Sequence, residues 1–255
     1  MAAANVPGMN DPLRILVVQN DDDKPTGRVG RALEAAGVEL TLAMAYGPIP
    51  SVADFDGLIS LPGTGNPVDD EQAIHDARDA IIEARSLGRP VLGICLGGQL
   101  LAQAAGAEIY QCTPELGIYP VRTTAAAQDD PLFTGIPATY ESLHAHGYAF
   151  KPIEGATVLI ENDVCCQAMR IGDRDWALQL HPESTRDWLH SLAGAIELDY
   201  SGDVLPETAV FFRQMGVDPI LLRQQADELD ELHTAIANQI ASGFADACRS
   251  ARAER

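Results

Sequence analysis

The sequence predicts an α/β fold of three layers, in which a mostly parallel central sheet lies between helices on both faces. Up to residue 94, short apolar runs alternate with helix-forming segments, and this alternation is typical of parallel strands joined by helices. From 107 to 179, strands and turns follow one another, which predicts an added small antiparallel sheet. Beyond residue 181 the pattern becomes helical again. The 255 residues, 46% of them hydrophobic, suffice for one large domain.

The first half of the chain supplies the expected parallel strands. Segment 13–18 predicts a buried strand because it is a short apolar run that ends in polar residues. Gly37 predicts the end of the first helix, since glycine readily adopts the left-handed conformation found after helix C-termini. The second helix is amphipathic, with alanine and isoleucine along one face. The expected strands are 13–18, 38–44, 55–61 and 90–94, and the expected helices are 27–36 and 69–87.

The second half supplies the antiparallel strands and the C-terminal helices. Its expected strands are 108–111, 117–123, 157–160 and 176–180. One helical region is expected from about residue 185, and a long final helix is expected at 218–249. Apolar residues at near-heptad spacing give the final helix an apolar face. This face packs either against this chain's own core or against a partner protein. We expect a single domain over 1–255, with a core at about 13–198 and a helical C-terminal extension at 199–255.

The charge of the chain excludes two classes of partner. Against 17 Lys and Arg stand 37 Asp and Glu, giving a formal net charge of −20. Such a surface repels phosphate backbones and anionic lipids, so the sequence predicts neither a nucleic-acid nor a membrane partner. No apolar run approaches the ~18 residues of a membrane span.

The five cysteines indicate a reducing compartment. Their number is odd, two are adjacent, and no C-x-x-C pair occurs, a pattern that fits neither a disulfide framework nor a zinc cage. The first eleven residues lack the basic and apolar regions of a signal peptide. Together these observations predict a cytoplasmic protein.

The segment 91–101 carries the strongest chemical signal. An apolar strand leads into Gly93, then Cys95, then Gly97, and a helix follows. This is the G-x-nucleophile-x-G pattern of a nucleophile elbow, with cysteine in place of serine. Small neighbours permit a strained turn, and the following helix N-terminus favours the reactive thiolate. The amide of Leu96, one residue on, is then placed to donate to an oxyanion. An ordinary buried cysteine in a strand-to-helix turn is the alternative interpretation.

A cysteine nucleophile needs a base, and His181 is the best candidate among six histidines. It stands where an expected strand ends, and Glu183 follows two residues later, within reach of the imidazole. A His-x-Glu tripeptide is common by chance. Combined with the cysteine elbow, it predicts a Cys95–His181–Glu183 catalytic triad.

These motifs resemble the class I, triad-type glutamine amidotransferase family. The matching segments, in family order, are 61–67 (LPGTGNP), 93–101 (GICLGGQLL), 115–121 (ELGIYPV), 146–150 (HGYAF) and 179–183 (QLHPE). The resemblance extends over about 13–188 and is greatest for stand-alone members similar to the amidotransferase domain of GMP synthase. It implies the flavodoxin-like amidotransferase fold.

The resemblance implies a role for each matching residue. Cys95 would attack the side-chain amide of glutamine and form a γ-glutamyl thioester, with His181 as acid and base and Glu183 as its orienter. The family's other functional positions correspond to the oxyanion donors Gly63 and Leu96 and the substrate-binding residues Gly65, Gln99, Gly147 and Tyr148. No cofactor and no metal are implied.

Three functions remain open at this stage. The first is a glutamine amidotransferase subunit that releases ammonia for a separate synthase, since no ATP-binding motif for acceptor activation is present. The second is a stand-alone γ-glutamyl peptidase or hydrolase that acts on a γ-glutamyl conjugate. The third is a non-catalytic binding module. His144 and His146 could also ligate a metal, but the sequence shows no third ligand at a suitable spacing.

Overall fold

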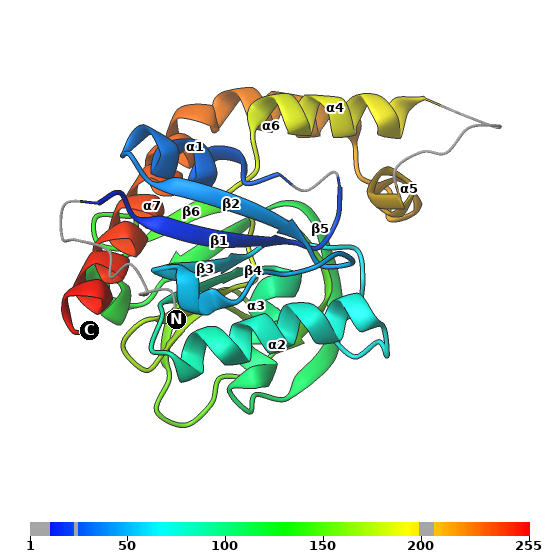
Figure 1. Ribbon diagram of the computed structural model, residues 1–255. Coiled ribbons are helices and arrows are strands. Elements are labelled where there is room, and N and C mark those ends of the chain that lie inside the picture. Colours follow the sequence, from blue (N-terminus) through cyan, green and yellow to red (C-terminus); the bar gives the residue numbers. More distant parts are fainter. Residues whose placement is uncertain (1–10, 23–24, 199–206) are drawn as a thin grey trace.

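The computed structural model describes residues 11–22, 25–198 and 207–255. A nine-stranded mixed sheet, with strand order β2-β1-β3-β4-β9-β8-β7-β5-β6, forms its centre (Figure 1). The strands are β1 (Arg14–Gln19), β2 (Glu39–Met44), β3 (Gly57–Ser60), β4 (Val91–Ile94), β5 (Ile109–Thr123), β6 (Thr139–Phe150), β7 (Thr157–Glu161), β8 (Cys166–Ile171) and β9 (Asp175–Leu178). The helices are α1 (Gly27–Ala35), α2 (Gln72–Ser86), α3 (Leu96–Ala104), α4 (Arg186–Glu197), α5 (Glu207–Gln214), α6 (Pro219–Glu228) and α7 (Asp230–Ala253).

The parallel half of the sheet contains the four parallel strands expected from the sequence and also β9, which was expected among the antiparallel strands. Strands β2, β1, β3, β4 and β9 all run in the same direction. Successive side chains of β1 alternate between two apolar clusters, with Val17 on one face and Val18 on the other. Helices α1 and α7 cover the first face, and α2 and α3 cover the second (Figure 1). The three-layer α/β/α fold is therefore confirmed.

The antiparallel strands continue the same sheet. β8 pairs with β9, then β7, β5 and β6 follow in antiparallel order, so the added strands extend the central sheet beyond its parallel half. The two strands expected at 108–111 and 117–123 are one long strand, β5, interrupted by a register shift between Gln111 and Glu115. β6, its long antiparallel partner, was not anticipated from the sequence.

The final helix is two helices rather than the single one expected at 218–249. α6 ends at Glu228, and α7 starts at Asp230 after Leu229. The apolar face of α7 packs on this chain's own sheet, where Ile240 and Phe244 are fully buried. α4, α5 and α6 form a separate apolar cluster against β5 and β6. Residues 199–206 of the expected C-terminal extension lie outside the described residues.

The topology brings the candidate catalytic segments together. In register, Ile94 at the end of β4 lies opposite Leu178 at the end of β9. Because both strands run in the same direction, Cys95 and Gln179 follow at one edge of the sheet, which is where parallel α/β sheets place their ligand sites. Within the described residues, no helix has both the length and the apolar character needed to cross a membrane.

Candidate active site

Cys95 occupies a strained turn between β4 and α3. Its φ is +50°, and it is the single non-glycine residue of positive φ in the described part of the chain. Its N–H donates to the carbonyl of Leu178 at 2.7 Å, which fixes the turn against β9. A β-carbon on Gly97 would lie 2.1 Å from the Ser60 carbonyl oxygen, and one on Gly98 would lie 2.3 Å from that of Leu178. The turn therefore has the conformation expected of a nucleophile elbow.

Replacing Gly97 with alanine tests this close packing. We expect the free energy of unfolding to fall by about 1–3 kcal/mol, because the added methyl group would force α3 away from β3. Gly194→Ala is the matched control: its β-carbon would meet nothing nearer than the Arg223 guanidinium at 3.7 Å, and alanine is favoured over glycine within a helix. Urea unfolding followed by circular dichroism measures both. Equal stability of the two variants would contradict the tight elbow.

His181 and Glu183 form a buried pair beside the elbow. His181 Nδ1 lies 2.8 Å from Glu183 Oε1, and both side chains are less than one-tenth exposed. The pair is held by the backbone: the His181 N–H donates to Leu143 in β6, and the Glu183 carbonyl accepts the N–H of Arg28 in α1. Burial alone would lower the pKa of His181, but the charges of Glu183 and Cys95 raise it to about 10. The imidazole is thus held as a cation.

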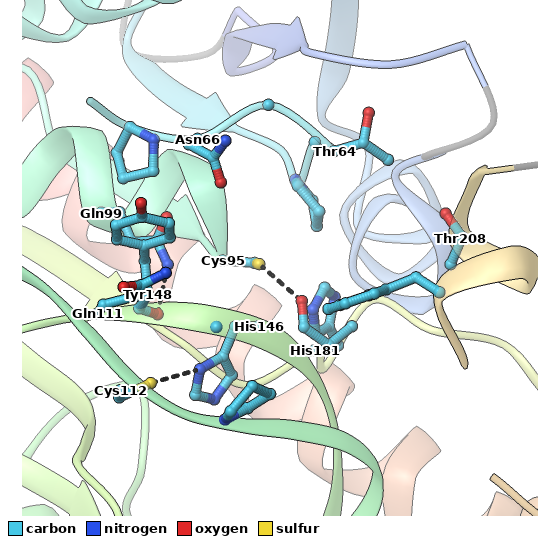
Figure 2. Close-up of a pocket in the computed structure, with 18 of the residues that line it drawn as sticks. Thr64, Asn66, Cys95, Gln99, Gln111, Cys112, His146, Tyr148, His181 and Thr208 are labelled. Atoms are coloured by element: carbon cyan, nitrogen blue, oxygen red, sulfur yellow. Dashed lines mark hydrogen bonds between the residues drawn. The ribbon is translucent and has the colours of Figure 1, made fainter. Parts of the chain in front are cut away.

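The opposite nitrogen of His181 is available for chemistry. Nε2 is buried and makes no hydrogen bond of regular geometry within the described residues. The Cys95 thiol donates to the Ala145 carbonyl at 3.8 Å, and the Gln179 amide donates to the sulfur at 3.7 Å. Figure 2 shows Cys95 and His181 side by side in the cavity. Once Cys95 is ionised, a rotation of its side chain would replace the Ala145 contact with one in which protonated His181 donates to the sulfur.

The cavity has a volume of about 660 Å³ and three walls. The loop after β3, Pro62–Pro67, forms one, and β5 and β6 form another (Figure 2). The third comes from α5, which contributes Thr208, Phe211 and Phe212. Cys95 and His181 lie at the junction of these walls.

The loop after β3 packs against the elbow. A β-carbon on Gly63 would lie 2.7 Å from Leu96 Cδ2, so the backbone of Gly63 lies directly beside Leu96. Leu96 is the first residue of α3, and the N–H groups in the first turn of a helix have no acceptor within it. Gly65 approaches Ile74 and Leu96 slightly less closely. This arrangement brings together the two residues expected to donate to an oxyanion.

The expected substrate-binding residues line the β5–β6 side. Gln99, Gly147 and Tyr148 all border the cavity. The Gln99 amide nitrogen donates to the Tyr148 carbonyl at 2.8 Å and to Gln179 Oε1 at 3.1 Å, so it joins α3 to β6. Both of its N–H groups are used by the protein, which leaves its oxygen as the atom able to bind a ligand.

A buried polar cluster lies behind this wall. Glu115 Oε2 lies 3.2 Å from His146 Nε2 and 3.7 Å from His144 Nδ1. The expectation of no third ligand is wrong, because β5 brings Glu115 to the two histidines, and the three could hold a cation. Protonation of His146 offers another source of positive charge for Glu115. Burial opposes ionisation of His146, yet Cys112 and Glu115 raise its pKa to about 9, while burial lowers that of His144 to about 3. A proton on His146 neutralises Glu115.

Some residues close to Cys95 or in the cavity wall were missed by sequence reasoning. Gln179 is the first residue of the 179–183 segment that contains His181. Because side chains alternate along a strand, Gln179 lies on the opposite face from Leu178 and Leu180, and this alternation could have placed it beside Cys95. Cys112 lies in the cavity wall, where its hydrogen bond with Cys165 and the nearby His146 lower its pKa to about 5. No sequence signal places the α5 residues in the cavity, because a helix after residue 206 could pack anywhere.

Curated relatives share most of the chain. A glutamine-hydrolyzing GMP synthase subunit from Archaeoglobus fulgidus is 32% identical over 163 residues, covering 61% of this chain and 81% of that protein. A putative glutamine amidotransferase-like protein, YfeJ, from Salmonella typhimurium is 29% identical over 71% of this chain and 80% of its own length. An imidazole glycerol phosphate synthase subunit HisH from Symbiobacterium thermophilum is 34% identical over 65% of this chain and 85% of its own length.

Solved structures agree in fold. A glutamine amidotransferase from Thermotoga maritima superposes with a TM-score of 0.78 at 19% identity, covering 91% of this chain and 97% of that one. A glutamine amidotransferase from Methylobacillus flagellatus superposes with a TM-score of 0.79 at 20% identity, covering 93% of this chain and 96% of that one. The sequence model named glutamine amidotransferase class-I matches residues 18–188, two thirds of the sequence that includes the elbow and the His181–Glu183 pair. The chain therefore belongs to the class I glutamine amidotransferase family.

Proposed function

We propose that this chain hydrolyses the γ-amide of glutamine through a γ-glutamyl thioester on Cys95 and releases ammonia for a separate synthase. The observation that carries the proposal is the meeting of the strained Cys95 turn with the buried His181–Glu183 pair at one cavity. Relatives named as subunits of GMP synthase and of imidazole glycerol phosphate synthase support the partner.

The chemistry assigns one step to each group. The Cys95 sulfur adds to the γ-carbonyl carbon, and the backbone N–H groups of Gly63 and Leu96 stabilise the oxyanion. His181 gives its proton to the leaving nitrogen, so the C–N bond breaks and ammonia departs. His181 then takes a proton from water, which adds to the thioester and yields glutamate and the free thiol. Glu183 orients the imidazole throughout and stabilises it whenever it carries the proton.

The test is direct chemistry on the purified chain. Incubation with glutamine should produce equal amounts of glutamate and ammonia, and rapid acid quenching should leave a glutamyl adduct on the peptide that contains Cys95, identified by mass spectrometry. A synthase partner should increase the rate. Failure to form this adduct from any γ-glutamyl amide would reject the proposal.

A second candidate is hydrolysis of a γ-glutamyl conjugate without a partner. The observation that favours it is the third cavity wall, which α5 supplies. Both candidates use the same thioester, and they differ only in what leaves with the nitrogen. Comparing the rate with glutamine to the rates with γ-glutamyl conjugates separates them.

A further inference from the structure

The α5 wall, which consists of Thr208, Phe211 and Phe212, lies outside the segment that matches the family. That match ends at residue 188, whereas all three wall residues border the cavity. The wall is firmly held: Phe212 is fully buried in the cluster of α4, α5 and α6, and the Arg213 guanidinium donates to the Ile196 carbonyl of α4 at 2.9 Å. Phe211, on the same helix, is 41% exposed.

The wall stands on the leaving-group side of Cys95. Gln99 and Tyr148 lie to one side of the sulfur, and Thr208 lies to the other, beyond His181 (Figure 2). A second, small cavity is bordered by His181, Glu183 and Thr208 together, which places α5 next to the catalytic imidazole. Since His181 protonates the departing nitrogen in the proposed mechanism, any group attached to that nitrogen extends toward α5.

The cavity offers such a group space, and the α5 wall itself carries no charged side chain. Its volume is about 660 Å³, within the range of roughly 300–1,000 Å³ found for pockets that enclose drug-sized ligands. Drug-sized ligands are much larger than glutamine, so the cavity has room for a group attached to the leaving nitrogen. Among the described residues that line it, none is Asp, Glu, Lys or Arg. A charged substituent would lose its hydration against these three wall residues without an ion pair from α5, whereas an apolar one would gain from covering Phe211.

We propose that the α5 wall is a leaving-group subsite that binds the uncharged, apolar amine portion of a γ-glutamyl amide. The inference rests on the proposed thioester chemistry and favours the second candidate function. In the acylation step the bond between the γ-carbon and nitrogen breaks, Cys95 retains the glutamyl group, and the amine leaves with the proton of His181. Water then releases glutamate.

The experiment compares three substrates: γ-glutamyl benzylamide, γ-glutamylglycine and glutamine. For the unaltered chain we expect kcat/KM to be at least about tenfold higher for the benzylamide than for either of the others, a size of discrimination typical of apolar pockets. Phe211→Ala should lower kcat/KM for the benzylamide by about tenfold, chiefly through KM, so that the benzylamide loses its advantage over glutamine.

Met215→Ala is the matched control. Met215 is a large apolar residue close to Phe211, 49% exposed and not part of the cavity lining, so its truncation should change none of the three rates. Equal rates for γ-glutamylglycine and the benzylamide would overturn the apolar preference. If Phe211→Ala had unaltered benzylamide kinetics, the proposed subsite would be overturned. This outcome would also be expected if the α5 wall docked a synthase and did not bind substrate. Absence of a Cys95 adduct with every substrate would reject the thioester chemistry itself.

Discussion

Replacing Cys95 with alanine is expected to lower kcat for amide hydrolysis about a million-fold, to the level found when the nucleophile of a triad is removed. The thioester cannot form without the sulfur, and the remaining oxyanion donors stabilise only a slow attack by water. Cys95 is 5% exposed and contacts Ala145 and Gln179 through its sulfur. Ammonia release from glutamine, coupled to a glutamate dehydrogenase assay, measures the effect.

Cys112 provides the critical control for this prediction. It borders the same cavity and has a pKa lowered to about 5 by Cys165 and His146, so low pKa alone would make it a rival nucleophile. It lies on β5, however, without the positive φ and helix N-terminus that characterise the turn at Cys95. Cys112→Ala should therefore still form the glutamyl adduct. Loss of the adduct in Cys112→Ala, with its retention in Cys95→Ala, would reverse the assignment.

Replacing Glu183 with glutamine is expected to lower kcat about 10⁴-fold, as removal of the orienting carboxylate does in other triads. Its carboxylate is the largest influence that raises the pKa of His181 to about 10 against the opposing effect of burial. In the unaltered chain the imidazolium is present at neutral pH and is lost only as pH rises through about 10. Without the carboxylate, the lowering effect of burial is less strongly opposed, and the proton is lost at a lower pH.

Proton NMR of histidine labelled with carbon-13 measures this titration directly. The His181 signal is assigned by its disappearance in His181→Gln. Its midpoint should move from about 10 toward neutral pH in Glu183→Gln. An unshifted His181 midpoint would show that Glu183 does not hold the imidazolium. The measurement avoids substrate, whose own amino group titrates in the alkaline range.

The local parts of the site could be predicted from the sequence. The turn at Cys95 depends on small residues at Gly93, Gly97 and Gly98, and steric contact over a few residues determines it. His181 and Glu183 are two residues apart, so their pairing needs little beyond an extended backbone. The first four parallel strands were equally predictable, because the period of apolar residues reports strands and helices directly.

Other features depended on contacts between distant segments. The long strand β6 carries His144 and His146, and only its pairing with β5 brings Glu115 to them. The final helix divides at Leu229, although its apolar spacing continues, because α6 joins the cluster of α4 and α5 while α7 packs on the sheet. Spacing along the chain carries no information on which surface a helix covers.

By itself, then, the sequence determined the fold class, the turn at Cys95 and the pairing of His181 with Glu183, since each follows from interactions among near neighbours in the chain. The tertiary structure alone decided that β4 and β9 lie side by side, which brings Cys95 to His181, and that α5 forms a wall of the cavity. Both depend on burial of apolar surface between segments tens of residues apart. The choice of substrate, as we propose it, resides in that second, non-local part.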